Sequence, residues 1–292
     1  MTDTTTRVGL IQLCATPDVP ENLKTVDRLV NQAVGEGAEV VLLPEAFAFI
    51  GRDREKRLIV ETLPGPPTST SATGPTSTPT STPTPIFEHC SELASRHGID
   101  LVLGGHHEAG PDPEHSFNTC VHLNTSGAIA AVYRKIHLFD VNLADGTRLH
   151  ESARTAAGSE VVATSMPFGQ LGLTICYDVR FPYLFQSLVD LGAVAISVPS
   201  AFTATTGAAH WHTLLKARAI ETQCYVLAPA QYGNHHGRRV SYGHSLIIDP
   251  WGETVAERAE DTDGVVIADI DPDRVREVRE QLPSLQHRRC LE

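Results

Sequence analysis

The sequence lacks any block of basic residues and any apolar run long enough to span a membrane. Its 23 Lys and Arg residues are outnumbered by 35 Asp and Glu residues, which gives a formal net charge of −12. Nucleic-acid binding depends on clustered Lys and Arg side chains that neutralise phosphates, and a membrane-spanning helix needs about 20 apolar residues. The composition therefore predicts a protein with neither a nucleic-acid nor a membrane partner.

Paired cysteine motifs are also missing. The six cysteines show no CxxC spacing and no regular pattern. The N-terminal segment has no apolar region of the kind found in signal peptides and leads directly into a strand pattern. Scattered thiols in a chain of this size are typical of a reducing compartment. We therefore expect a cytoplasmic protein with reduced cysteines, and this expectation leaves a mitochondrial pool open.

What the chain does contain is an alternation of strand and helix patterns over its full length. Strands are predicted at residues 8–13, 38–43, 100–104, 119–123, 128–134, 171–175, 194–198, 225–230, 244–249 and 264–269. Helices are predicted at residues 22–36, 87–97, 182–191, 208–221 and 272–281. Such alternation predicts an α/β layered fold in a single domain, residues 1–292.

One segment interrupts this alternation. Residues 64–85 consist almost entirely of Pro, Thr, Ser and Gly. Such a segment has no apolar face to bury, so we expect a disordered surface insertion at about 64–85. Either an inert loop or a docking or phosphorylation segment is compatible with this composition, and the inert loop is the simpler interpretation.

The most informative segment is 171–182, in which an apolar strand pattern ends at Cys176 and Pro182 opens a helix pattern. Cys176 is therefore predicted to lie on a strand-to-helix turn, which would present its thiol to a substrate together with backbone N–H groups. Proximity to a helix N-terminus would favour the thiolate. A buried structural cysteine is the alternative interpretation.

Two more polar residues end apolar strands, Glu45 after 40–43 and Lys135 after 130–134. Functional groups in layered α/β proteins gather at strand ends, so Glu45, Lys135 and Cys176 are predicted to form one acyl-transfer site. Glu45 would accept the thiol proton and return it to the leaving amine. Lys135, helped by the backbone N–H of Tyr177, would stabilise the oxyanion. Taken singly, Glu45 fits a helix N-terminal acid and Lys135 an exposed cation.

These three residues and their flanking sequences, Leu-Pro-Glu45-Ala, Tyr-Arg-Lys135-Ile-His-Leu and Ile-Cys176-Tyr-Asp, resemble the signature of the nitrilase superfamily of carbon–nitrogen hydrolases. The resemblance covers nearly the whole chain except the insertion. It implies a four-layer αββα sandwich, a Cys–Glu–Lys triad, no metal, no cofactor and a homodimer. It also implies that Glu151 is a second active-site glutamate, which would orient Lys135 or the attacking water.

The sequence Cys176-Tyr-Asp-Val-Arg-Phe-Pro resembles the Nit-type amidases rather than true nitrilases. Within these amidases, several segments resemble the deaminated glutathione amidase branch: 199–207, 209–212, 218–225, 230–236, 241–245, 249–252 and 286–289. That branch hydrolyses a small-molecule amide to α-ketoglutarate and cysteinylglycine through a Cys thioester. The alternatives are an ω-amidase acting on α-ketoglutaramate or another small aliphatic amide and, from a different class, a non-catalytic binding or scaffold protein.

Substrate-binding residues follow from the same reasoning. Arg180, four residues after Cys176, is predicted to bind a substrate carboxylate through its guanidinium fork; a salt bridge to Asp178 is the alternative. Tyr177, Phe202 and Thr206 are predicted to contribute to the substrate pocket. The fourteen histidines show no metal-binding motif, so they are interpreted as surface or pocket residues. His210 and Trp211 are interpreted as packing or subunit-interface residues.

Overall fold

The computed structural model describes residues 4–64, 85–142, 148–237 and 239–289. Nearly all of the predicted insertion at 64–85 lies outside the described residues, so its disorder and the single-domain assignment stay predictions. No helix in the described ranges is long and apolar enough to cross a membrane.

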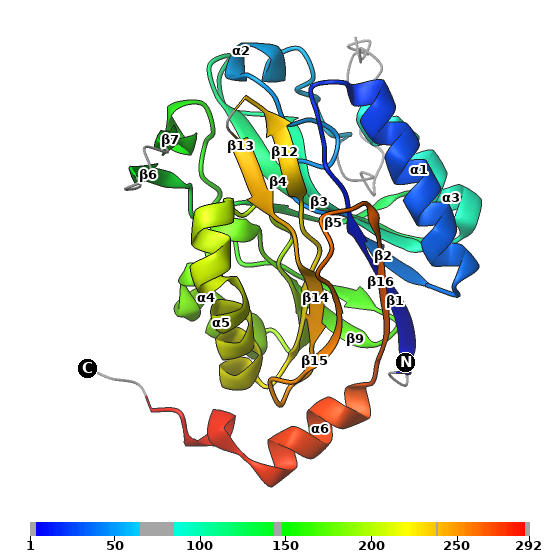
Figure 1. The fold of residues 1–292 in the computed structure, drawn as a ribbon. Helices are drawn as coiled ribbons and strands as arrows, with labels where there is room; N and C mark the ends of the chain where they lie inside the picture. The colour runs from blue at the N-terminus through cyan, green and yellow to red at the C-terminus, as the bar shows by residue number, and fades with distance from the viewer. Residues whose placement is uncertain (1–3, 65–84, 143–147, 238, 290–292) are drawn as a thin grey trace, which may run out of the picture.

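Two six-stranded sheets form the centre of the molecule (Figure 1). The first has the order β16-β1-β2-β3-β4-β5, with bounds β16 Gly264–Ile270, β1 Thr6–Gln12, β2 Val40–Leu42, β3 Asp100–Ala109, β4 Ser116–Leu123 and β5 Ile129–Arg134. The second has the order β15-β14-β11-β10-β9-β8, with bounds β15 Thr254–Arg258, β14 Ser245–Ile248, β11 Tyr225–Ala228, β10 Ala193–Ser197, β9 Gly169–Leu173 and β8 Ala163–Met166. In each sheet parallel pairs lie next to antiparallel ones.

Helices cover the outer face of each sheet. α1 (Val19–Gly35) and α3 (Pro85–His97) pack on the first sheet, and α4 (Pro182–Asp190) and α5 (Ala204–Thr222) pack on the second. The order helix, sheet, sheet, helix gives the predicted four-layer αββα sandwich. α6 (Pro272–Gln281) follows β16 and extends beyond the layers (Figure 1).

β2 shows why several predicted strands are continuously apolar. Val40 and Leu42 point into the core between the two sheets, whereas Val41 and Leu43 point into the core under α1 and α3. Successive side chains of a strand lie on opposite faces, and both faces of this sheet are buried. The apolar run is therefore the expected pattern for an inner strand of a layered fold.

The structure corrects several predicted boundaries around the site. β3 continues to Ala109 rather than ending at 104, and β9 ends at Leu173, so Cys176 begins a 3₁₀ turn, η2 (Cys176–Arg180), that precedes α4. The sequence analysis also missed elements that are short or polar and carry no clear periodicity. These are α2 (Asp53–Lys56), β6 (Asp140–Asn142), β7 (Arg148–His150), η1 (Glu151–Ala153), β12 (Tyr232–His236), β13 (Arg239–Tyr242), η3 (Ser284–His287) and the edge strands β8 and β15.

Candidate active site

Cys176 lies on a tight turn directly after the second sheet's β9. Its backbone has a φ of 49°, in the left-handed region that non-glycine residues rarely adopt, and its N–H donates to the Pro199 carbonyl at 2.9 Å. The residue is 7% exposed. A strained backbone conformation that is held by its surroundings is characteristic of functional turns. In this turn Cys176 faces the residues that follow β2 and β5 of the first sheet.

Asp178 connects this turn to the strand that carries Lys135. Its Oδ2 accepts from the Tyr133 hydroxyl at 2.6 Å and from the Ile175 N–H at 2.8 Å, while its Oδ1 accepts from the His137 backbone N–H at 3.1 Å and from His137 Nδ1 at 2.6 Å. The side chain is fully buried. Because Tyr133 and His137 flank Lys135 on both sides, the carboxylate of Asp178 sets the position of Lys135 relative to Cys176. No ion pair joins Asp178 to Arg180 in the described part of the chain, since these partners occupy both oxygens.

Lys135 lies between two glutamates. Its Nζ is 3.0 Å from Glu45 Oε1 and 2.8 Å from Glu151 Oε2, and its side chain is 2% exposed. Glu45 Oε2 accepts from the backbone N–H of Ala201 at 2.8 Å, and the Cys176 thiol hydrogen-bonds to the Glu45 carboxylate. The structure thus brings together all four residues that were predicted as catalytic.

Burial and charge determine the protonation states in this cluster. Burial, and then the negative charge of Glu45, raise the pKa of the Cys176 thiol well above its usual value. Burial opposes the charge on Lys135, but Glu151 and Glu45 hold its pKa well above the usual value. Burial alone would raise the pKa of Glu45, yet the Lys135 ammonium and the hydrogen bonds with Cys176 and Ala201 hold it below 4.5.

The expectation that a helix N-terminus favours the Cys176 thiolate is therefore wrong. The 3₁₀ turn separates Cys176 from the first turn of α4, and the electrostatic effect of a helix falls off within one turn. At neutral pH the thiol is protonated and Glu45 is ionised, so this site holds an acid and a base in contact rather than a preformed thiolate.

Asn118, on β4, is a site residue that the sequence analysis missed. Its Nδ2 lies 2.9 Å from Glu45 Oε1 and 3.2 Å from Glu151 Oε1, so one amide holds both carboxylates on either side of Lys135. No local signal singled it out, because Asn118 lies just before the predicted strand 119–123 and β4 also carries Ser116, Thr119 and His122. Gly105 makes room for the Asn118 side chain, because a Cβ there would lie 2.9 Å from Asn118 Oδ1 and from the backbone nitrogen of Ala46.

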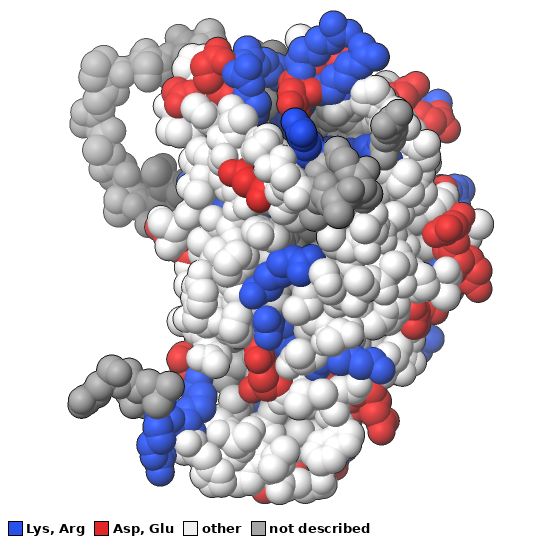
Figure 2. Space-filling view, turned by 60° about the vertical axis from the view of Figure 1, so that its left-hand side comes forward, with Lys and Arg blue, Asp and Glu red and all other residues white. Residues whose placement is uncertain are grey.

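A cavity of about 370 Å³ opens over this cluster and is lined by Glu45, Lys135, Glu151 and Cys176. Four further basic residues line it: Lys56 on α2, Arg148 on β7, Arg154 and Arg239 on β13. Figure 2 shows Lys and Arg side chains gathered at the end of the molecule where α2, β7 and β13 lie in Figure 1. Lys56 donates to Thr155 Oγ1 at 3.2 Å, and burial lowers its pKa. The sequence analysis missed these cations because they come from four separate segments.

The predicted substrate-binding residues contact one another and one residue of the cavity lining. The guanidinium of Arg180 is 5.2 Å from the Phe202 ring centre and 5.8 Å from that of Tyr177. The Thr206 hydroxyl is 2.7 Å from that of Thr203, and Thr203 lines the cavity. Arg180, Tyr177, Phe202 and Thr206 are not among the described residues that line the cavity, and their binding role stays a prediction.

Trp211 is fully buried, with its ring centre 5.0 Å from that of Phe202, so it is a packing residue. His210 Nδ1 lies 3.4 Å from the Arg180 guanidinium. The five described cysteines are unpaired, and Cys290 lies outside the described residues.

Comparison with known proteins places this site in a family. The carbon-nitrogen hydrolase model matches residues 7–280. Proteins named deaminated glutathione amidase from Bos taurus and from Synechocystis sp. are each 43% identical to this chain. The alignments cover 97% of this chain and 81% of the Bos taurus protein, and 95% of this chain and 96% of the Synechocystis protein.

Solved structures agree with the sequence matches. The C. elegans NitFhit protein superimposes with a TM-score of 0.86 at 39% identity, over 99% of this chain and 66% of that one. Saccharomyces cerevisiae Nit3, a member of branch 10 of the nitrilase superfamily, gives a TM-score of 0.82 at 30% identity, over 96% of this chain and 95% of that one. These likenesses confirm the predicted fold class. The chain therefore belongs to the carbon-nitrogen hydrolase family, within the nitrilase superfamily.

Proposed function

We propose that the protein is a thiol amidase that hydrolyses deaminated glutathione to α-ketoglutarate and cysteinylglycine. The observation that carries this proposal is a buried, ionised Glu45 in contact with both the Cys176 thiol and the Lys135 ammonium. A protonated thiol beside an ionised carboxylate is a nucleophile with its general base already in hydrogen-bond contact.

The chemistry follows from these contacts. Glu45 takes the proton from Cys176 Sγ as the sulfur attacks the amide carbonyl, and Lys135 Nζ with the Tyr177 N–H stabilises the oxyanion. The C–N bond then breaks, and protonated Glu45 gives its proton to the leaving amine. Water attacks the resulting thioester with Glu45 again as base, which frees the acid and restores the thiol. Glu151 holds Lys135 in position throughout.

The basic lining of the cavity supports this substrate. Deaminated glutathione carries two carboxylates, one on its α-keto acid end and one on its glycine end, whereas α-ketoglutaramate carries one. Lys56, Arg148, Arg154 and Arg239 line the cavity, so cations are available for both carboxylates. The relatives at 43% identity are named for this substrate. Charge-assisted bonds to carboxylates are strong enough to orient a small substrate over the thiol.

We propose further that the protein acts as a cytoplasmic homodimer on a small-molecule amide, without nucleic acid, membrane, metal or cofactor in the reaction. The formal charge of −12 supports the exclusion of nucleic acid, and the unpaired described cysteines support a reducing compartment. The homodimer rests on the family resemblance. Sedimentation of the purified chain measures the oligomeric state directly, and a monomer at micromolar concentration would contradict the dimer.

The function is tested by measuring hydrolysis of deaminated glutathione and α-ketoglutaramate side by side, with the Cys176→Ser variant and with Cys224→Ser as a matched control. Cys224 is also buried, but it is not among the residues that line the cavity. We expect preference for deaminated glutathione, almost no turnover by Cys176→Ser and near-normal turnover by Cys224→Ser.

Preference for α-ketoglutaramate would instead identify an ω-amidase. Equal activity of Cys176→Ser and the unaltered chain would refute the mechanism. Absence of turnover on both substrates would favour the binding or scaffold interpretation.

A further inference from the structure

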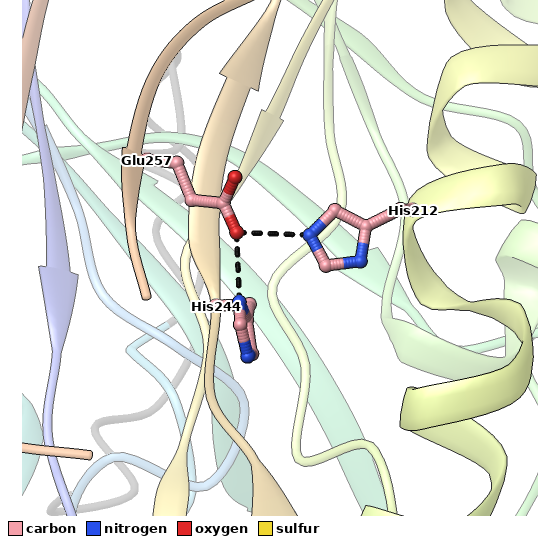
Figure 3. A group of neighbouring side chains, drawn as sticks. All are labelled: His212, His244 and Glu257. Carbon is pink, nitrogen blue, oxygen red and sulfur yellow. Dashed lines mark hydrogen bonds and ion pairs between the residues drawn. The ribbon is translucent and has the colours of Figure 1, made fainter. Parts of the chain in front are cut away.

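A second group of chemically active side chains lies outside the cavity over Cys176. His212 on α5, His244 at the junction of β13 and β14, and Glu257 on β15 converge on one point (Figure 3). His212 Nε2 is 2.9 Å and His244 Nδ1 is 2.7 Å from the same oxygen, Glu257 Oε1. The three ligand atoms all lie within 4.8 Å of one another.

The backbone holds these residues in place without any help from their mutual hydrogen bonds. The His244 carbonyl accepts from Trp211 Nε1 at 2.9 Å, and Trp211, the neighbour of His212 in sequence, is fully buried. His244 has a φ of 58°, and its ring stacks on Tyr242 with ring centres 4.4 Å apart. Glu257 is fixed by the β14–β15 ladder, where it pairs with Leu246. The three side chains are therefore positioned by buried or hydrogen-bonded backbone, which is the condition for a preorganised ligand site.

The donor set determines which ion fits. Two imidazole nitrogens and one carboxylate oxygen suit Zn²⁺ and related transition ions, whereas Mg²⁺ and Ca²⁺ prefer oxygen ligands alone. Ligands about 2.0–2.1 Å from a tetrahedral ion lie about 3.3 Å apart. The present separations from Glu257 Oε1 are 2.9 and 2.7 Å, so small side-chain rotations would admit the ion.

Binding of a metal ion also requires that the ligand atoms of His212, His244 and Glu257 carry no proton. Zn²⁺ binds the lone pair of an imidazole nitrogen, so the ring nitrogen that now faces Glu257 gives up any proton it carries to the other ring nitrogen or to solvent when the ion binds. Burial opposes the charge on Glu257, but hydrogen bonds from His212 and His244 hold its pKa below the usual value. The carboxylate is therefore ionised at neutral pH and needs no deprotonation to bind a cation.

We propose that His212, His244 and Glu257 form a binding site for one Zn²⁺ ion that joins α5 to the second sheet. The side chains are 34%, 23% and 26% exposed, so the ion is reached from solvent and keeps its fourth position for water. The site lies apart from the catalytic cluster: none of its three residues lines the cavity. Its effect is on stability, because the ion binds only when the helix and the two strands are assembled.

The experiment uses the full chain purified without a polyhistidine tag, in a Cys176→Ala background so that no thiolate in the cavity binds zinc. Zinc binding is measured by calorimetry, ligand geometry by the visible spectrum of Co²⁺, and stability by thermal unfolding with and without Zn²⁺. The variants are His212→Ala, His244→Asn, because Asn tolerates the left-handed backbone, and Glu257→Gln. The control is His115→Ala, since His115 Nδ1 lies 2.9 Å from Asp112 in a pair without a second histidine.

We expect one Zn²⁺ per chain, a tetrahedral Co²⁺ spectrum and a higher unfolding temperature with Zn²⁺. His212→Ala and His244→Asn should weaken binding by about 100-fold or more, because losing even an outer partner of a metal ligand costs 10–100-fold. His115→Ala should bind as the background protein does. The proposal is overturned if the background binds no zinc, or if His212→Ala retains the affinity and the stabilisation; the three side chains would then be only a hydrogen-bonded group.

Discussion

Asp178 offers the sharpest test of how the fold positions the site. The change Asp178→Asn keeps the size of the side chain but replaces one acceptor oxygen by an NH₂ group. The four donors around Asp178 come from Tyr133, Ile175 and His137. The Tyr133 hydroxyl can turn to accept from an NH₂ at the Oδ2 position, and His137 Nδ1 can accept at the Oδ1 position in its other tautomer. In either orientation a backbone N–H, that of Ile175 or that of His137, loses its acceptor.

The cost can be estimated from these bonds. One buried donor left unpaired costs about 1–3 kcal/mol, and the two bonds from His137 each lose about 1 kcal/mol when their acceptor becomes neutral. The free energy of unfolding should therefore fall by about 4 kcal/mol, which for a chain of this length corresponds to an unfolding temperature lower by about 7 °C. Because Tyr133 and His137 flank Lys135, kcat should also fall about 100-fold, the typical effect of a displacement near 1 Å.

The assay is thermal and urea unfolding, together with kcat and KM measured at a temperature where the variant is still folded. Asp269→Asn is the matched control, since Asp269 is 54% exposed and pairs with Arg7 at 3.4 Å; its effect should stay under about 1 kcal/mol. If Asp178→Asn unfolds within 1 kcal/mol of the unaltered protein and keeps its kcat, Asp178 does not link Lys135 to Cys176 as argued.

Four further outcomes are expected. Glu45→Gln should lower kcat by a factor of about 10²–10⁴ with little change in KM. A fall in kcat of less than tenfold would argue against Glu45 as the general base. Despite its burial, the Lys135 ammonium holds the pKa of Glu45 below its usual value, so kcat/KM should stay constant through the ordinary glutamate range and decline only at lower pH. Lys135→Met removes the cation and should move this decline to higher pH; an unchanged profile would mean that Lys135 does not act on Glu45. Burial lowers the pKa of His235 from 6.5 to about 4. Because the unfolded state then takes up the proton first, the free energy of unfolding should fall by about 3 kcal/mol as the pH drops from 6.5 to 4. Urea unfolding of His235→Gln should lack this loss, and a variant with the same pH profile as the unaltered protein would exclude His235 as its cause. Gly105→Ala should lower both stability and kcat, because its Cβ would press on the Ala46 backbone; unchanged unfolding and kcat would show that the strand yields without displacing Glu45.

The main strands and helices could be predicted from periodicity, because buried strands and amphipathic helices leave strong patterns. The αββα order of the layers was implied only by the family resemblance. The apolar run 38–43 and the helical spacing of 22–36 correspond to β2 and α1. The ends of the strands and helices were predicted less accurately where tertiary contacts, rather than local propensity, determine them. β9 ends two residues before the predicted strand end, because the carboxylate of Asp178 takes the Ile175 N–H that a longer ladder would use.

The residues of the candidate site likewise fall into those that the sequence could predict and those that it could not. Glu45, Lys135 and Cys176 each follow a short apolar run, so their place at strand ends could be predicted. The basic residues around the cavity could not, because Lys56, Arg148 and Arg239 lie on short elements without periodicity. The same holds for His212, His244 and Glu257, which are separated by 32 and 13 residues in sequence. They meet only because α5 packs against β13 and β14 and because β15 pairs with β14.

By itself, then, the sequence determined an α/β layered fold and three residues of the candidate site, because burial on both faces of a strand and a polar residue at its end are local patterns. The αββα order of the layers was implied by the resemblance to the nitrilase superfamily. Only the tertiary structure decided the protonation of that site. Burial and the mutual charges of Glu45, Lys135, Glu151 and Cys176 set their pKa values, and these depend on distances between segments that no local pattern records. For that reason Cys176 is a thiol paired with a base rather than the free thiolate that its sequence context suggested.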